Sequence, residues 1–359
     1  MNSAVLYVFG LMSLVWGIII FLISFIPYYS NGMMVFGIAI PKTQMKNYEL
    51  HKIKDTYAWF CIIAGILLAL VSMLTYFRFQ SLKTMWIQIF AIFIYLWITI
   101  FFYIKSYKKV KKLKETNDWV IDTTKEGTEI NSISLSSTFN HWIYLILLIV
   151  IGVGIGLVAY RYPMIPDKIP MHFNMEGVAT HYVTKSLETF AILPIIQVLI
   201  MVVFVGISIA IDKARSNANN QRDHIYKKSM GYMLFFIGLL ITIFLSSLEI
   251  SLAGIIPGTL IKFLPVFYVV ILFIMLVYFS AKVGQGGNRI NDNAEINTLD
   301  DEQYWHFGIF YNNKKDPSLF VENRVGLGLT MNFGNKLSWI VIGGMGVFVI
   351  SILILTRLL

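Results

Sequence analysis

The chain has 359 residues, of which 57% are hydrophobic and only 14% are charged, and its formal net charge is +9. A soluble globule of this size would leave far more apolar surface in water than so few charges can offset. The composition therefore excludes an ordinary soluble protein and predicts an all-α polytopic protein of the lipid bilayer. The single cysteine, Cys61, excludes an intramolecular disulfide.

Eight apolar runs are long enough to cross the hydrocarbon core as helices, because a helix rises about 1.5 Å per residue and the core is about 30 Å thick. The first run is not expected to be a cleaved signal, since no basic residue precedes it and no small-residue cleavage site follows it. The predicted spans are residues 4–27, 57–77, 84–104, 142–160, 189–211, 229–250, 259–281 and 337–357.

The distribution of Lys and Arg predicts the orientation of these spans. The first, third, fifth and seventh loops hold 22 of the 29 basic residues, and the second, fourth and sixth loops hold 5. Because basic loops remain cytoplasmic, both termini and the fourth loop are expected outside, in a multi-pass protein of the plasma membrane. Topology thus explains the positive charge, and we expect no nucleic-acid partner.

Composition shifts along the chain indicate five regions. A Gly- and Asn-rich linker, 284–293, opens the largest loop, and the runs 305–311 and 324–333 that follow it are rich in aromatic and branched residues. We therefore predict a small β-containing unit there. The regions are an N-terminal membrane region with three spans and basic loops (1–140), a region with an external segment (141–211), a membrane hairpin (212–282), the cytoplasmic linker and β-containing unit (283–336), and the last span (337–359).

Six lysines lie between residues 105 and 114, directly after the third predicted span. Such a run attracts anionic headgroups, each lysine contributing on the order of 1 kcal/mol near the surface. It also serves as a topology determinant, and the sequence does not distinguish the two roles.

A three-residue pattern occurs twice on the predicted cytoplasmic side. Phe36 and Gly37 precede Ile38, and Phe307 and Gly308 precede Ile309. We interpret the two as copies of one element that can pack together. They belong to a predicted cytoplasmic platform for lipid headgroups or a regulator, made of Phe36, Gly37, Pro41, Phe307, Gly308, Tyr311, Asn312, Asn332 and Gly334.

The fourth loop contains one compact polar segment, which is the best candidate for a recognition site. Pro166 and Pro170 preset extended backbone, and Asp167 keeps the turn in water. The stiff stretch is expected to present His172-Phe173-Asn174 above the bilayer, and Gly177 allows the chain to turn back.

Several chemical roles are open to His172: a metal ligand, an acid or base, a pH-sensing group, a partner contact or a hydrogen-bonded structural residue. Glu176 and His181 lie near it in sequence, but their spacing matches no established zinc pattern. We therefore predict no metal and no cofactor.

The run from Pro163 to Lys185, with its P-D-x-I-P-x-H-F-N-x-x-G core, resembles the uncharacterised domain of SdpI-type bacterial immunity membrane proteins. The run from Phe307 to Asn335 resembles a second uncharacterised domain that often accompanies it in Firmicutes. The resemblance implies a multi-pass protein of the Gram-positive plasma membrane. The best understood member protects its producer from a secreted peptide toxin and holds a repressor at the membrane.

This chain departs from that pattern after Gly177. Relatives commonly carry an acidic residue there, whereas this chain has Thr180 and His181. Lys185 matches the pattern, which implies a place for it in the external contact together with Pro166, Asp167, Pro170, His172, Phe173, Asn174 and Gly177.

Intramembrane ionisable residues are few, and two of them mark a hairpin near the predicted outer face. Glu249 ends the sixth span and Lys262 begins the seventh, so the hairpin is expected to let them form an ion pair. The alternative is that they line the wall of a cavity open to the outside.

The motif inventory favours a non-enzymatic protein that senses or neutralises a secreted antimicrobial peptide or envelope stress. No zinc-protease helix or nucleophile elbow appears in the sequence. One alternative is a transporter or exporter of a small molecule or peptide, supported by eight spans with Pro194 and Pro265 inside them. A membrane-embedded hydrolase using His172 with Glu176 or Glu249 is a further alternative.

Overall fold

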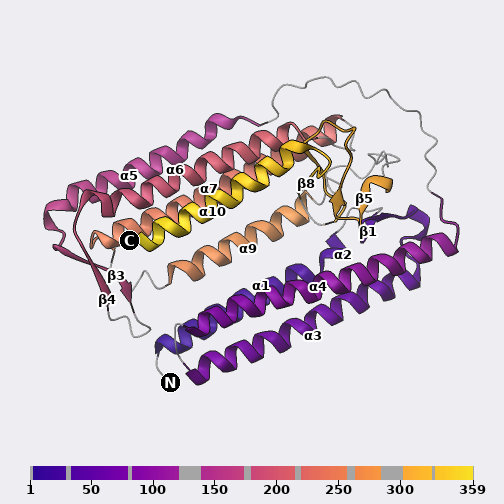
Figure 1. Ribbon diagram of the computed structural model, residues 1–359, viewed down its shortest axis with the longest axis horizontal. Coiled ribbons are helices and arrows are strands. Elements are labelled where there is room, and N and C mark those ends of the chain that lie inside the picture. Colours follow the sequence, from indigo (N-terminus) through magenta and orange to yellow (C-terminus); the bar gives the residue numbers. More distant parts are fainter. Residues whose placement is uncertain are drawn as a thin grey trace.

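Long helices dominate the structure, a computed structural model that describes residues 3–29, 34–79, 83–120, 139–173, 179–214, 220–256, 263–283, 302–325 and 328–358. Figure 1 shows these helices side by side along one direction. The helices are α1 (Ser3–Ser24), α2 (Ile26–Tyr29), α3 (Tyr48–Phe79), α4 (Lys83–Thr116), α5 (Leu145–Arg161), α6 (Leu187–Asp212), α7 (Asn220–Leu252), α9 (Leu264–Lys282) and α10 (Lys336–Leu358).

The strands form small antiparallel pairs, each made of two neighbouring segments of the chain. A parallel bridge between Tyr311 and Asn332 connects two of these pairs. The pairs are β1 (Met34–Val35) with β2 (Ile38–Ala39), β3 (Lys168–Phe173) with β4 (Ala179–Thr184), β5 (Trp305–His306) with β6 (Phe310–Tyr311), and β7 (Phe320–Glu322) with β8 (Leu329–Met331).

The helices confirm an all-α polytopic membrane protein. Within the described residues, seven helices are long and apolar enough to cross a membrane, and the eighth predicted span, 337–357, is helical as α10. Both termini and the β3–β4 pair lie at one end of the helices, and β1, β5 and β8 lie at the other (Figure 1). We call these the outer end and the inner end. The arrangement agrees with the prediction that the termini and the fourth loop share one side, and the two labels follow the orientation predicted from the basic residues, which stays a prediction.

Three helices are much longer than the spans predicted within them. α3, α4 and α7 have 32, 34 and 33 residues, or about 50 Å each, against a hydrocarbon core of about 30 Å. Segments 48–56 and 105–116 are helical continuations at the inner end. The polar stretch before Tyr57 was compatible with an amphipathic helix leading into the span, whereas 105–116 was expected to be a loop. Hydropathy does not detect such extensions, although Lys and Glu are good helix formers.

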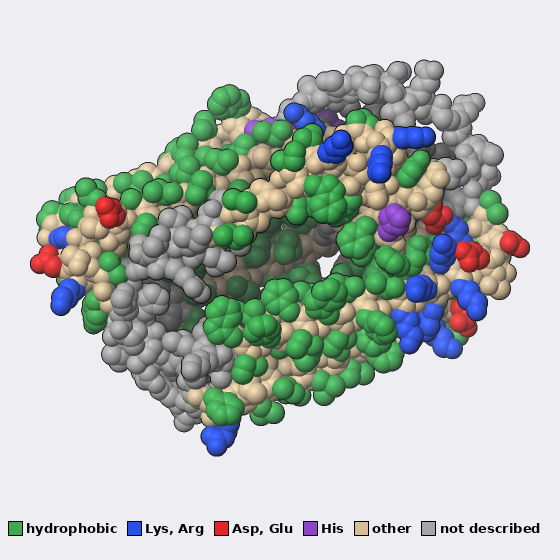
Figure 2. Space-filling model, in the orientation of Figure 1, with side chains coloured by type: hydrophobic (Ala, Val, Ile, Leu, Met, Phe, Trp, Pro, Cys, Tyr) green, Lys and Arg blue, Asp and Glu red, His purple; other side chains and the backbone are tan. Residues whose placement is uncertain are grey.

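The long helices form two groups with α9 between them. One group contains α1, α3 and α4, the other contains α5, α6 and α7, and α9 contacts both α1 and α7. Ring contacts of Phe21 with Phe273 and of Tyr7 with Phe263 join α1 to α9, with centroids 5.9 and 6.0 Å apart. Figure 2 shows a hollow with hydrophobic side chains around it between the groups.

A polar contact fastens the first group inside the apolar region. Buried Gln88 of α4 accepts a hydrogen bond from the Trp16 indole of α1 at 3.2 Å and donates one to the Ser72 carbonyl of α3 at 2.7 Å. One amide thus satisfies groups on two neighbouring helices, as required where no water is present. The outward surfaces, by contrast, carry exposed hydrophobic side chains along both groups (Figure 2).

The orientation can be tested with single cysteines, because Cys61 is buried and unique in the chain. In a Cys61→Ser background, we expect Asp167→Cys to react with a membrane-impermeant maleimide added to intact cells. Lys111→Cys is expected to react only after the membrane is opened, since it lies on the inner extension of α4. Labelling of Lys111→Cys in intact cells would reverse the topology.

Candidate functional site

The segment of the fourth loop that was predicted to be external is a β-hairpin. Strand β3 pairs with β4 over Lys168↔Thr184 and Ile169↔Val183, and the register shifts on both sides of His172. The sequence predicted a stiff extended stretch here without a partner strand. Tyr182, Val183 and Thr184 are β-favouring residues, and they supply the partner that the prediction lacked.

The structure places the predicted contact residues along this hairpin. Pro166 and Asp167 are exposed just before β3, and Pro170 is half-buried within it. The backbone of His172 pairs with that of His181, and Phe173 ends the strand. The side chains of residues 171–181 lie outside the described part of the structure, as do Asn174 and Gly177 entirely.

Lys185 closes the base of the hairpin. Its Nζ donates hydrogen bonds to the carbonyls of Tyr162 at 3.2 Å and Ile165 at 2.9 Å, and it lies 4.9 Å from the centre of the Tyr162 ring. Its backbone N–H donates to the Asp167 carbonyl at 2.7 Å. Lys185 therefore fixes both strands to the outer end of α5, which is a positioning role.

The inner face of the hairpin packs onto the helices beneath it. Ile169 is 1% exposed and belongs to a cluster with Ile165, Phe190 of α6 and Ala253, the residue after α7. The hairpin is thus seated on the outer ends of α5, α6 and α7. A movement of β3 is expected to displace these helix ends, because close-packed side chains transmit strain.

A buried polar cluster lies between α6 and α7 below the hairpin. The Gln197 side chain donates to Ser246 Oγ at 3.3 Å, and Glu249 lies one turn farther along α7 with 1% of its surface exposed. A Cβ at Gly154 of α5 would lie 3.5 Å from Glu249 Oε2, which is ordinary van der Waals contact, so α5 packs directly against the carboxyl group. The predicted partner, Lys262, lies outside the described residues.

Two acceptors of this cluster have no hydrogen-bond partner in the described structure: Glu249 Oε2 and Gln197 Oε1. Buried polar atoms are normally paired, and unpaired ones in an apolar surrounding cost free energy. The cluster is therefore chemically able to bind a donor, such as a proton or an ammonium group, a short distance below the hairpin.

Helix α7 connects this outer region with the inner end. At its outer end it contacts β3. Near its inner end, the Tyr226 hydroxyl accepts a hydrogen bond from the Gly328 N–H at 3.2 Å, and the Tyr226 side chain packs in a cluster that includes Leu329 of β8. One continuous helix of 33 residues therefore contacts both predicted functional regions.

At the inner end, the two Phe-Gly pairs form matching turns that touch each other. Phe36 and Gly37 have φ values of 49° and 77°, and Phe307 and Gly308 have values of 53° and 71°. Two successive positive φ angles are typical of the type I′ turn that joins adjacent strands. A Cβ on Gly37 would lie 2.5 Å from the Cα of Gly308, so the two turns meet backbone to backbone.

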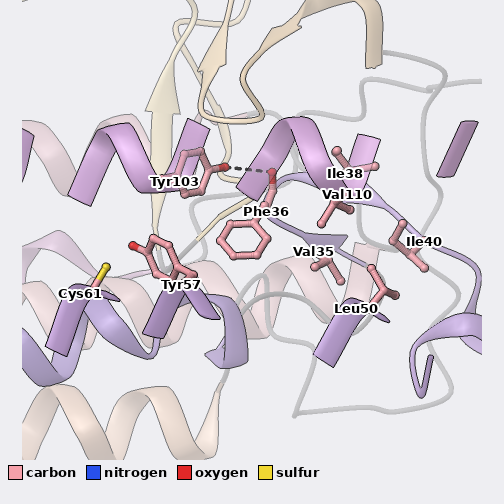
Figure 3. Packing of buried hydrophobic residues seen from close by; sticks show 9 residues of the cluster. All are labelled: Val35, Phe36, Ile38, Ile40, Leu50, Tyr57, Cys61, Tyr103 and Val110. Carbon is pink, nitrogen blue, oxygen red and sulfur yellow. Dashed lines mark hydrogen bonds between the residues drawn. The ribbon is translucent and has the colours of Figure 1, made fainter. Parts of the chain in front are cut away.

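Tyr103 of α4 bridges the two turns. Its hydroxyl oxygen lies 3.0 Å from the Phe36 carbonyl oxygen and 3.1 Å from the Phe307 carbonyl oxygen. The hydroxyl has one hydrogen to donate, and the two carbonyls share it. Figure 3 shows the Tyr103 hydroxyl directed at the Phe36 carbonyl, with the Tyr57 ring of α3 also next to the phenyl ring. The Arg324 guanidinium donates a hydrogen bond to the Gly37 carbonyl at 3.3 Å, and its central carbon lies 5.0 Å from the centre of the Trp305 ring.

The amide of Asn332 organises the loop between β6 and β7. The side chain is fully buried, and its Nδ2 lies within 3.2 Å of the carbonyls of Asn313, Asp316 and Ser318. Its Oδ1 accepts from the N–H groups of Asn313 and Gly334 at 3.0 Å. Each side of the amide is therefore satisfied, and the role of Asn332 is structural.

The remaining platform residues also support backbone geometry. Tyr311 donates its hydroxyl to Asp316 at 3.0 Å, and a Cβ at Gly334 would lie 2.5 Å from the Asn313 carbonyl carbon. The Asn312 N–H donates to the Tyr304 carbonyl at 2.9 Å, and its side chain is exposed. Pro41 precedes a short 3-10 helix and lies apart from these loops in the chain.

Sequence reasoning missed Tyr103, Arg324, Gln197 and Tyr226. Tyr103 and Gln197 lie inside apolar runs, where a single polar group is the one signal that could have marked them. The sequence gives no sign of the contact between Tyr226 and Gly328, because residues so far apart in the chain form no local pattern.

Comparison with known protein families gives two matches. A domain of unknown function (DUF1648) matches residues 147–198, which span most of α5, the hairpin and the first half of α6. A family of unknown function (DUF5808) matches residues 314–339, which span the loop held by Asn332, both β7 and β8, and the start of α10. Both matches fit a membrane protein without assigning a function, and neither names the SdpI type.

No curated protein and no solved structure matches the chain. The two family matches coincide with the two regions that α7 contacts, the outer hairpin and the inner β-containing unit.

Substitution of Gly37 tests the contact between the turns. Gly37→Ala is expected to lower the free energy of unfolding by about 3 kcal/mol, because it adds backbone overlap to the cost of a positive φ. The control is Gly254→Ala, whose φ is 72° with nothing within 4 Å, and about 1 kcal/mol is expected. Thermal unfolding in detergent measures both, and equal losses would contradict the contact.

Removal of the Lys185 ammonium tests the base of the hairpin. Lys185→Met leaves two carbonyls without this donor and is expected to cost about 1–3 kcal/mol. The hairpin should then be cut faster by protease added outside. Lys168→Met, which removes the same charge from an exposed position in β3, is expected to leave the cleavage rate unchanged. Similar acceleration in both variants would show that charge alone matters.

Proposed function

We propose that this multi-pass membrane protein is a non-enzymatic sensor of the plasma membrane, which detects or neutralises a secreted antimicrobial peptide or an envelope stress. In this proposal the hairpin around His172, Phe173 and Asn174 makes the external contact. The inner β-containing unit, with the two Phe-Gly turns, meets a cytoplasmic regulator.

The observation that carries this proposal is the double contact of α7. The helix touches β3 at its outer end and holds Gly328 through Tyr226 at its inner end. An external ligand that shifts the hairpin would therefore act on the inner unit through one rigid element. Such coupling requires that the ligand bind two arrangements of the hairpin with different affinity.

The inner unit passes such a shift on to the first helix group. Its Phe307-Gly308 turn lies against the Phe36-Gly37 turn, and Tyr103 of α4 binds both carbonyls. Lys114, near the end of α4, also forms a 3.0 Å ion pair with Glu302. The proposed signal therefore reaches both helix groups on the inner side.

A transporter is the second candidate, favoured by the polar cluster of Gln197, Ser246 and Glu249. Unpaired buried acceptors near one membrane face are a feature of ion and substrate paths. If transport is the function, Glu249→Gln should abolish activity more completely than His172→Ala, and cellular accumulation of the toxin or solute should change with expression.

The experiment compares survival of a deletion strain under a panel of secreted antimicrobial peptides. Wild type is expected to restore resistance and His172→Ala is not. Tyr226→Phe removes the acceptor of the Gly328 N–H and is expected to weaken resistance severalfold, as loss of about 1 kcal/mol of coupling predicts. Tyr232→Phe on the same helix is the control, because its ring contact with Phe139 is retained.

The outcomes separate the parts of the proposal. Full rescue by His172→Ala removes the proposed role of His172, and full rescue by Tyr226→Phe removes the proposed relay. If the deletion strain is not sensitised to any peptide, immunity is excluded and transport becomes the leading candidate. Protein levels measured in the membrane fraction exclude poor expression as the cause of a failed rescue.

A further inference from the structure

A basic groove lies between the inner extensions of α3 and α4. Its volume is about 400 Å³, and its lining includes Lys52 of α3 with Lys109 and Lys112 of α4. These residues are on the inner side of the apolar runs of both helices. Figure 2 shows a concentration of Lys and Arg side chains at this end of the molecule.

The charge of the groove fits an anion. The three ammonium groups are opposed by one lining carboxylate, that of Glu49. None of the three lysines forms an ion pair among the described residues, whereas the nearby Lys114 is paired with Glu302. The positive charge of the groove is therefore available to a phosphate-type ligand.

An apolar hollow continues from this groove toward the membrane. The hollow is about 380 Å³ and shares Lys52 and Thr56 with the groove; it is also lined by Tyr48, His51 and Asp55, whose carboxylate accepts a hydrogen bond from Tyr28, and by Trp59, Phe60 and Ile63 on the side toward the membrane. Residues at positions i, i+4, i+7 and i+11 lie on one face of a helix, so the lining runs along α3. Trp59 and Ile63 are 63% and 53% exposed, and Trp is typical of the membrane interface.

We infer that the groove and the hollow together bind one anionic glycerophospholipid. Its phosphate lies among Lys52, Lys109 and Lys112, and an acyl chain lies along Trp59 and Ile63. A free phosphate ion would use only the groove and would leave the apolar hollow without an occupant. The site does not depend on the sensing function proposed above.

The spacing of lysines on α4 provides a matched control. Lys108 and Lys111 are exposed but do not line the groove, whereas Lys109 and Lys112 do. The double variants Lys108→Ala/Lys111→Ala and Lys109→Ala/Lys112→Ala remove the same charge from the same helix. If the protein is only attracted to an anionic surface, lipid binding should weaken equally in both variants. If the groove is a specific binding site, lipid binding should weaken mainly in Lys109→Ala/Lys112→Ala.

The experiment uses the full chain in nanodiscs of phosphatidylcholine with increasing fractions of phosphatidylglycerol. Native mass spectrometry after release into detergent counts retained lipids. Wild type is expected to retain one phosphatidylglycerol saturably, and Lys109→Ala/Lys112→Ala to weaken retention at least about tenfold. Lys108→Ala/Lys111→Ala should stay within about twofold of wild type.

Four results would overturn all or part of the inference. Equal weakening in the two double variants would indicate surface attraction only, and equal retention of phosphatidylcholine would remove the selectivity for anions. Displacement of the lipid by soluble glycerol phosphate at equal concentration would indicate a phosphate site instead of a lipid site. Trp59→Ala should weaken lipid retention without changing the binding of glycerol phosphate, and an unchanged lipid affinity would remove the acyl-chain contact.

Discussion

Contact between two glycine backbones determines how the halves of this protein meet at the inner end. Gly37 and Gly308 approach so closely that neither leaves room for a Cβ, and both have positive φ angles. The glycine of each turn is thus required for two reasons: its positive φ angle, and the absence of space for a Cβ beside the other turn. Tyr103 can bridge the two carbonyls only because the backbones are this close. Elsewhere, contact between the helix groups depends largely on α9.

Much of the membrane architecture was predictable, because hydrocarbon thickness and the placement of positive charge act on the sequence directly. The inner extension of α4 was missed because hydropathy marks where apolar residues end and not where the helix ends. The β4 strand was missed because pairing is a relation between segments. Repetition of the Phe-Gly pair did indicate that Phe36-Gly37 and Phe307-Gly308 can pack together. The bridging role of Tyr103 was not predicted, because the only sign of it in the sequence is one hydroxyl group in an apolar run.

The candidate site was predictable only in part for the same reason. Pro166 and Asp167 were singled out from local patterns and Lys185 from the family resemblance, and the carbonyls bound by the Lys185 ammonium depend on the folded chain. Asn332 was assigned to a contact platform, whereas its buried side-chain amide forms its hydrogen bonds with surrounding backbone groups. A residue in a family signature is therefore often a structural requirement of the fold.

The two polar centres of the protein differ in how far they are satisfied. Around Asn332 both ends of the amide have partners, which fixes one loop conformation. Around Glu249 and Gln197, acceptor atoms are left over in an apolar surrounding. Fully satisfied networks rigidify a structure, whereas an unpaired buried acceptor is costly and would be stabilised by a new donor. The inner unit is thus suited to be a rigid base and the outer region to be adaptable.

The length of α7 has a mechanical consequence. A straight helix of about 50 Å behaves as a lever, and a tilt of about 5° displaces one end by about 4 Å relative to the other. That displacement exceeds the length of the hydrogen bond between Tyr226 and Gly328, which is 3.2 Å. A small change in angle at the membrane surface would thus be enough to make or break a contact on the opposite side, without any helix having to unfold or slide.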